Sequence, residues 1–189
     1  MKTIPLRLIA AATLGLLSSC AYQTAARSAI AEDSVFSSGI RREVERCRAE
    51  AGRPALARHE GLDRLALVHS EYLKRHRNEL DLESQSGLHM GSYGRSLAAR
   101  RIYDFSYVNE FVVVSEAHAG DAKSPLSVDE SEVVKLTNDS SGDGMVVCGK
   151  EWTHLGVGVV TDNDGAVFTT QIFATKNPFQ DSIRTRFGP

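Results

Sequence analysis

The sequence contains no long apolar run, which limits how the chain can contact a membrane. The apolar stretch near its N-terminus, residues 8–17, is shorter than the roughly 20 residues that a membrane-spanning helix needs. No later segment reaches that length either. We therefore expect the folded part of the chain to lack a transmembrane helix.

Positive charge is also scarce. Lys and Arg number 22 against 24 Asp and Glu, and residues 1–19 hold two of the basic residues and none of the acidic ones. The chain from residue 20 onward thus has 20 basic and 24 acidic residues, a net charge of −4 with neutral histidines. Nucleic-acid binding and adhesion to anionic headgroups both need clustered positive charge, so the sequence argues against both. The basic pairs Arg41-Arg42 and Arg100-Arg101 are interpreted as solvated helix faces.

Several motifs of cofactor and nucleophile chemistry are missing as well. No serine or cysteine stands beside an evident general base. The glycines of residues 156–158 lie inside a predicted strand and open no helix, as a nucleotide loop would require. The acidic turn at residues 162–165 lacks the distal glutamate of a calcium loop. We predict neither a cofactor nor a metal.

What the N-terminal segment does contain is an export pattern. Lys2 and Arg7 precede the apolar stretch, and small residues then lead to Cys20. This order resembles the lipobox of bacterial lipoproteins, which implies that residues 1–19 are a signal peptide and that Cys20 is acylated. An ordinary secretory signal with an incidental cysteine is the alternative. Ala21, where some lipoproteins have Asp, resembles lipoproteins sorted to the outer membrane.

Two further cysteines, Cys47 and Cys148, remain in a chain that would enter an oxidising compartment. We predict a disulfide between them, which would close a loop of about 100 residues. The alternative is two separate buried thiols that behave as small apolar residues.

The chain after Cys20 is expected to form one domain over residues 37–176, between a tether (residues 20–36) and a C-terminal tail (residues 177–189). Ser37-Ser38 is predicted to cap a helix that Gly52 and Pro54 end. A second helix is predicted from about Gly61 to His76, a loop over residues 78–94, and a third helix over residues 95–101.

The rest of the domain is predicted to form β-strands and one short helix. Residues 111–114 predict a buried strand, and a capping box at residues 127–130 predicts a helix to about Thr137. Residues 154–160 and 166–173 flank an Asp-Gly turn and predict an antiparallel hairpin. The predicted class is α+β, with helices packed on an antiparallel sheet.

The order of these pieces resembles the CAP superfamily of cysteine-rich secretory, antigen 5 and pathogenesis-related 1 proteins (SCP-like domains), over roughly residues 38–175. The matching segments are residues 46–56, residues 62–73, Leu88-His89 through Arg95, the spacing of Tyr103 and Glu110, and residues 152–159. The resemblance implies an α-β-α sandwich with an open cleft, in which many members gather two histidines and two acidic residues.

Carried over to this sequence, the resemblance matches His89 to the first histidine and Glu110 to the first acid. The second histidine falls on Asp143, which leaves a more oxygen-rich set than the family's. Arg95 and Asp143 are the further predicted binding residues.

Each site residue also has a purely structural interpretation. His89 could be a loop histidine satisfied by water, and Glu110 could pair with Arg95, because an unpaired buried carboxylate is expensive. His69 lies on the apolar face of the second helix and is interpreted as a core histidine, and His154 as a structural residue at a strand entrance.

The sequence therefore predicts a monomeric cell-envelope lipoprotein, held at the membrane through Cys20, that binds a lipid, a peptide or an envelope component around His89 and Glu110. The first alternative is a hydrolase with Glu110 as base and His89 as acid or metal ligand. The second is a structural envelope element with a degenerate cleft.

Overall fold

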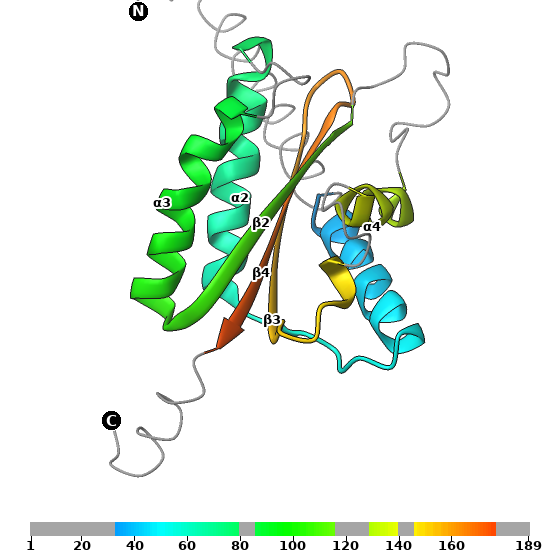
Figure 1. Cartoon of the computed structure of the whole chain (residues 1–189). Helices are drawn as coiled ribbons and strands as arrows, with labels where there is room; N and C mark the ends of the chain where they lie inside the picture. The colour runs from blue at the N-terminus through cyan, green and yellow to red at the C-terminus, as the bar shows by residue number, and fades with distance from the viewer. Residues whose placement is uncertain (1–32, 80–85, 116–128, 140–145, 177–189) are drawn as a thin grey trace, which may run out of the picture.

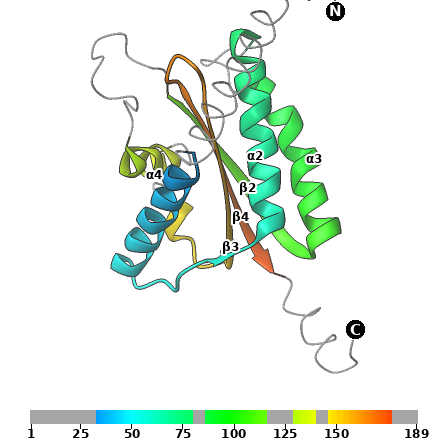
Figure 2. The same ribbon diagram turned by 180° about the vertical axis from the view of Figure 1, so that it is seen from behind.

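The structure is a computed structural model that describes residues 33–79, 86–115, 129–139 and 146–176, with only the backbone described for residues 86–94. The elements form three layers (Figure 1). Helices α2 (Glu60–Arg75) and α3 (Ser86–Tyr103) cover one face of a sheet. The N-terminal helix (residues 33–50) and α4 (Glu130–Asp139) cover the other, as the reverse view confirms (Figure 2). The predicted α+β class and α-β-α sandwich are thereby confirmed.

The sheet has the strand order β1-β3-β4-β2. Strands β2 (Phe105–Ser115), β3 (His154–Thr161) and β4 (Val167–Lys176) pair antiparallel, with β4 in the middle. The predicted hairpin of β3 and β4 is confirmed. The two-residue strand β1 (Ala57–Arg58) pairs parallel with β3, so the sheet is mixed rather than purely antiparallel. This pairing lies where the chain crosses from the N-terminal helix to α2.

Alternate strand residues build a core on each face of the sheet. Toward α2 and α3 the strands present Phe105, Ile172 and Ala174, which pack on Leu62 and Ala66 of α2. Toward the N-terminal helix and α4 they present Val113, Val157 and Phe173, which pack with Ile40, Val44 and Val133. Both sheet faces are therefore covered, which explains why most residues of β3 and β4 are buried.

The N-terminal helix includes residues that the sequence assigned to the tether. Residues 33–36 are helical, and Phe36 is buried in the core. Ser37 and Ser38 do not cap the helix as predicted, because their hydroxyls donate to the carbonyl of Ser34, at 3.1 and 2.8 Å. Both serines satisfy their hydroxyls inside the helix, so the predicted cap position is wrong.

Helix α3 begins well before its predicted start at residue 95. Residues 86–94, predicted to be loop, are helical despite their glycines. Glycine costs a helix about 1 kcal/mol relative to alanine, and packing against α2 and β2 outweighs that preference. Strand β2 is also longer than the four residues predicted. Helix α4 is capped by Asp129, whose carboxylate accepts from the backbone N–H of Glu132 at 2.8 Å.

Cys47 and Cys148, which the sequence predicts to be bonded, are two free thiols in the structure. The sulfurs are directed at different groups: Cys148 Sγ lies 3.6 Å from the Cys47 carbonyl oxygen, and Cys47 Sγ lies 3.9 Å from Glu43 Oε1. No bond therefore joins them here, yet they are neighbours rather than separate buried thiols.

The signal peptide, Cys20, Ser127, Asp143 and the C-terminal tail lie outside the described residues. Within the described residues, no helix has the length and apolar character needed to cross a membrane.

Candidate functional site

A buried polar network joins α2 and α3 to strands of the sheet, on the sheet face that these helices cover. Its centre is Glu110 of β2, which pairs with Ile172 across the ladder. The side chain of Glu110 is only 4% exposed. Successive residues of a strand point to opposite faces, so Glu110 shares its face with Val108 and Val112. A carboxylate among such neighbours needs partners.

Arg95 of α3 is the first partner. Its Nε donates to Glu110 Oε2 at 2.5 Å and its Nη2 donates to Glu110 Oε1 at 2.6 Å. This is the bidentate geometry in which guanidinium and carboxylate interact most strongly. The pairing of Glu110 with Arg95, predicted from the cost of burying a lone carboxylate, is confirmed.

His69 of α2 is the second partner. Its Nδ1 lies 3.4 Å from Glu110 Oε1 and 3.2 Å from the hydroxyl of Thr170 on β4. Burial lowers the pKa of His69 to about 4, an effect that nearby Glu110 opposes and Arg95 reinforces. His69 is therefore neutral near pH 7, and its contact with Glu110 is not an ion pair at that pH.

The network ends in hydroxyl groups between α2 and the sheet. Ser70 Oγ lies 3.0 Å from Thr170 Oγ1 and donates to the carbonyl of Gly158 at 3.1 Å. Ser70 and Thr170 are fully buried, so these contacts replace lost water. The network connects α2, α3, β2, β3 and β4.

The structure brings together some predicted site residues and leaves others undescribed. Glu110 and Arg95 meet, whereas Asp143 and the side chain of His89 lie outside the described part of the chain. The backbone of His89 lies within α3, so its predicted loop position is wrong. His69 is buried as predicted. Its contact with Glu110 was missed, although both residues stand on predicted buried faces.

His154 is half-buried at the start of β3, as its structural interpretation requires. Its ring packs edge-on against Phe105 with centroids 5.1 Å apart, and its Nδ1 lies 2.8 Å from Thr153 Oγ1. The described residues contain no group of three or more His, Cys, Asp or Glu side chains that could hold a metal ion.

An exposed apolar strip lies beside the network on α2. It consists of Val68 and Tyr72, one helical turn apart, and the ring of Tyr72 is 47% exposed. This ring stacks on His76 at a centroid distance of 4.1 Å and on His69 at 6.3 Å. His69 is held by Glu110 and Thr170, so the ring of Tyr72 stacks on a side chain that is itself fixed.

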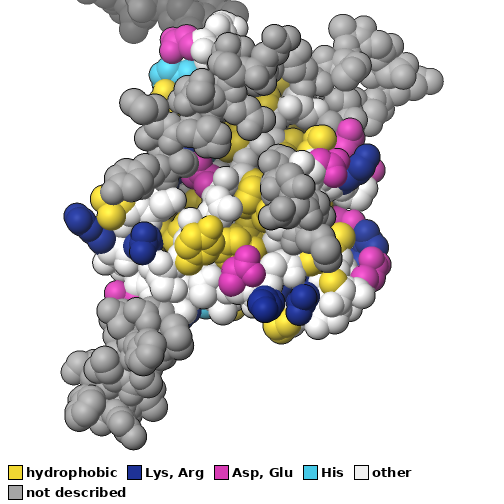
Figure 3. Space-filling view, viewed as in Figure 1, with side chains coloured by type: hydrophobic (Ala, Val, Ile, Leu, Met, Phe, Trp, Pro, Cys, Tyr) yellow, Lys and Arg dark blue, Asp and Glu magenta, His cyan; other side chains and the backbone are white. Residues whose placement is uncertain are grey.

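A second group of exposed apolar side chains lies elsewhere. Figure 3 shows hydrophobic side chains gathered near the middle of the face on which β2 lies in Figure 1. Tyr107 of β2, 54% exposed, stacks on Trp152 at a centroid distance of 5.3 Å. Tyr107 belongs to the opposite sheet face from Glu110 and so provides a comparison for Tyr72.

The arrangement holds Glu110 in place more than it prepares it to react. Both carboxylate oxygens accept from Arg95, and the group is shielded from solvent. A general base must reach the proton that it removes. In the described arrangement the oxygens of Glu110 are directed at Arg95 and His69.

No protein-family model and no curated protein matches this chain. Among solved structures, it is similar to an outer surface protein from Borrelia burgdorferi, with 12% identity and a TM-score of 0.48, covering 72% of this chain and 90% of that one. It is also similar to an extracellular protein containing an SCP domain from Bacillus anthracis, with 23% identity and a TM-score of 0.47. That match covers 70% of this chain and 38% of the other.

Proposed function

We propose that this chain is a cell-envelope lipoprotein whose CAP-like domain binds the apolar part of a lipid, a peptide or another envelope component. Acyl chains on Cys20 would hold it at the outer membrane. The Val68–Tyr72 strip on α2 would contact the ligand, next to the cleft expected around His89 and Glu110.

The observation that carries the proposal is the half-exposed ring of Tyr72 stacked on a histidine that is itself fixed. Aromatic rings give large apolar contact area, and a ring already held in place loses little conformational entropy on binding. The neighbouring Val68 extends the apolar area along the same helix face.

The hydrolase alternative has less support. It assigns Glu110 as the base, and both oxygens of that carboxylate are occupied by Arg95. Turnover of an envelope peptide by the wild-type chain, abolished in a Glu110→Gln variant that stays folded, would replace the binding proposal with the hydrolase.

The proposal is tested by identifying what the protein carries. Residues 1–20 are replaced by a cleavable secretory signal, so that the unlipidated chain is exported to the envelope compartment. It is purified without detergent, and its bound lipids and peptides are quantified by mass spectrometry. We expect a Val68→Ser, Tyr72→Ala variant to retain less than about one tenth of the bound ligand, since losing 1.4 kcal/mol weakens affinity tenfold.

The matched control is Tyr107→Ala, which removes a ring of similar exposure from the other sheet face. It should retain the wild-type amount of ligand. Equal recovery from the wild type and the Val68, Tyr72 variant would remove the strip as the binding surface.

A further inference from the structure

Two cysteines far apart in sequence meet at the layer formed by the N-terminal helix. Cys47 lies in that helix, and Cys148 ends the 3₁₀ helix η2 (Val146–Cys148), 101 residues later. Cys148 Sγ lies 3.6 Å from the carbonyl oxygen of Cys47, and both residues are half-buried. The binding function proposed above uses neither thiol.

Arg48 holds the two cysteines in this position. It directly follows Cys47 and is fully buried, which is unusual for arginine. Its Nη1 donates to the carbonyls of Val147 and Gly149, at 2.7 and 2.9 Å. These carbonyls belong to the residues on either side of Cys148. One side chain therefore spans from the neighbour of Cys47 to both neighbours of Cys148.

The turn that carries Cys148 is also fixed from its other side. The indole of Trp152 donates to the carbonyl of Val146 at 2.8 Å, and the backbone N–H of Val147 donates to Asn138 Oδ1 at 3.0 Å. Val147 itself is fully buried. These contacts hold the turn that carries Cys148 beside the N-terminal helix, which favours a bond between the two neighbouring sulfurs over bonds to other molecules.

We propose that Cys47 and Cys148 are a dithiol site that is oxidised to an intramolecular disulfide by exchange with a disulfide-bearing oxidant. The thiolate of one cysteine attacks the oxidant's S–S bond, and one oxidant sulfur leaves as a thiolate. The second cysteine thiolate then attacks the mixed disulfide and releases the other oxidant sulfur. Two protein thiols are oxidised, one disulfide is reduced to two thiols, and the two protons pass to the departing sulfurs.

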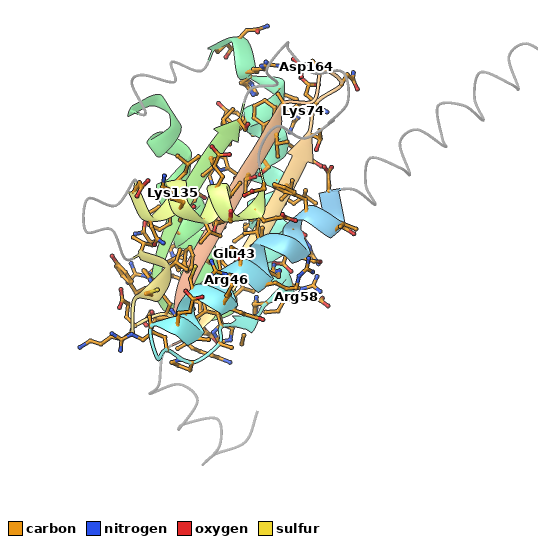
Figure 4. The ribbon with its side chains drawn as sticks, turned by 90° about the vertical axis from the view of Figure 1, so that its right-hand side faces the viewer. Glu43, Arg46, Arg58, Lys74, Lys135 and Asp164 are labelled. Atoms are coloured by element: carbon orange, nitrogen blue, oxygen red, sulfur yellow. The ribbon has the colours of Figure 1, made fainter. Side chains whose placement is uncertain are left out.

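The surroundings favour Cys148 as the attacking residue. Arg48 packs beside Cys148, with its Nη1 bonded to the carbonyls of both neighbours of Cys148 and its buried Nη2 lacking a hydrogen-bond partner among the described atoms. Burial and the carboxylate of Glu43 raise the pKa of Cys47. Figure 4 shows Glu43 and Arg46 on the N-terminal helix, where they pair with each other. Cys47 is thus the resolving thiol.

The bond would tie the N-terminal helix to the segment that enters β3. This helix is the described element nearest in sequence to Cys20. In the oxidised form, the C-terminal part of this helix would be covalently joined to η2.

The first test uses the full-length protein, purified from membranes and fully reduced. It is incubated with oxidised glutathione, and its thiols are then counted with a maleimide that shifts the mass. We expect both thiols to disappear together, with a loss of about 2 Da and no retained glutathione. The oxidised form should melt roughly 10 °C above the reduced form. Two thiols that still react after incubation, or a disulfide-linked dimer, would overturn the proposal.

The second test separates the roles of the two cysteines. In Cys47→Ser the mixed disulfide cannot be resolved, so glutathione should accumulate on Cys148. In Cys148→Ser we expect glutathione to add to Cys47 at least tenfold more slowly. Equal rates in the two variants would contradict the assignment of Cys148 as the attacking thiol, and absence of any adduct in either would contradict the exchange route.

Discussion

At the scale of the single residue, Glu110 of β2 depends on a charged partner from helix α3. Replacing Arg95 with methionine leaves the carboxylate 4% exposed and without its counter-charge. Removing one partner of a buried ion pair costs about 3–5 kcal/mol, because the remaining charge is uncompensated. We expect Arg95→Met to lower the free energy of unfolding by that amount, measured by urea denaturation at pH 7.5.

The control for this substitution is Arg100→Met, since Arg100 lies on the same helix but is exposed. It should change the free energy of unfolding by less than about 0.5 kcal/mol. Arg95→Met combined with Glu110→Leu should recover part of the loss, because no lone charge is then buried. A single Arg95→Met variant as stable as Arg100→Met would contradict the ion pair.

His69 gives the molecule a defined response to acid. Its pKa is about 4 in the folded state, against about 6.5 in the unfolded chain. Between these values the unfolded state binds more protons, so stability is fully present above pH 6.5 and falls as the pH drops toward 4. We expect a loss of about 2 kcal/mol between pH 7.5 and pH 5, measured by urea unfolding at each pH.

His69→Gln should remove most of that loss, whereas His76→Gln, at the C-cap of the same helix, should keep it. An unchanged pH dependence in His69→Gln would show that another group is responsible.

These residues also show what the sequence could predict of the site. The pairing of Glu110 with Arg95 followed from one rule, that a carboxylate in a buried strand requires a partner. The contact of Glu110 with His69 did not follow, because the residues are 41 positions apart and meet only once α2 is laid on the sheet. His69 was identified as buried by its helix face, and its neighbour is set by tertiary packing.

At the scale of elements, two glycines set how closely α2 approaches the sheet. A Cβ at Gly156 would lie 2.5 Å from the carbonyl carbon of Leu62, and one at Gly158 would collide with the backbone of Ala66 and Leu67. Backbone cannot move aside as a flexible side chain can. We expect Gly158→Ala to cost about 3 kcal/mol and to lower the Tm by roughly 6–12 °C in thermal denaturation.

Gly52→Ala is the matched control, because it has open space around it and only a positive φ of 67° to oppose a side chain. It should cost about 1 kcal/mol, the strain of a left-handed backbone. If Gly52→Ala were the more destabilising of the two, the close approach of α2 to β3 would be disproved.

Elements were predicted well where their signal is local and poorly where it is not. The hairpin of β3 and β4 has alternating apolar residues and an Asp-Gly turn, both visible in sequence. The start of α3 was misplaced by nine residues because its glycines resemble loop, and only contact with α2 and β2 reveals the helix. The helix cap at Ser37 and Ser38 was wrongly predicted for the same reason. The sequence alone does not distinguish a serine inside a helix from a serine at its N-cap.

At the scale of the whole molecule, the folded domain and its proposed location depend on different parts of the chain. The three layers are formed by described residues between 33 and 176, whereas the proposed location is inferred from the segment that ends at Cys20. The order of elements predicted the α+β class with helices packed on a sheet, and the family resemblance implied the three layers. Apart from Arg95 and Glu110, the side chains described above that meet between the layers, such as His69 and Glu110, come from segments that no sequence pattern paired.

The predicted lipid anchor at Cys20 can be tested independently of the fold. Acyl chains contribute about 0.8 kcal/mol per buried CH₂, so a protein acylated at Cys20 should partition into the detergent phase and incorporate labelled fatty acid. Cys20→Ser should abolish the label, since no thiol is left to acylate, while Cys47→Ser should keep it. Intact-mass analysis should place the first residue of the mature wild-type chain at position 20. An unlabelled wild-type chain cleaved elsewhere would instead establish an ordinary secretory signal and would leave the domain without a lipid anchor.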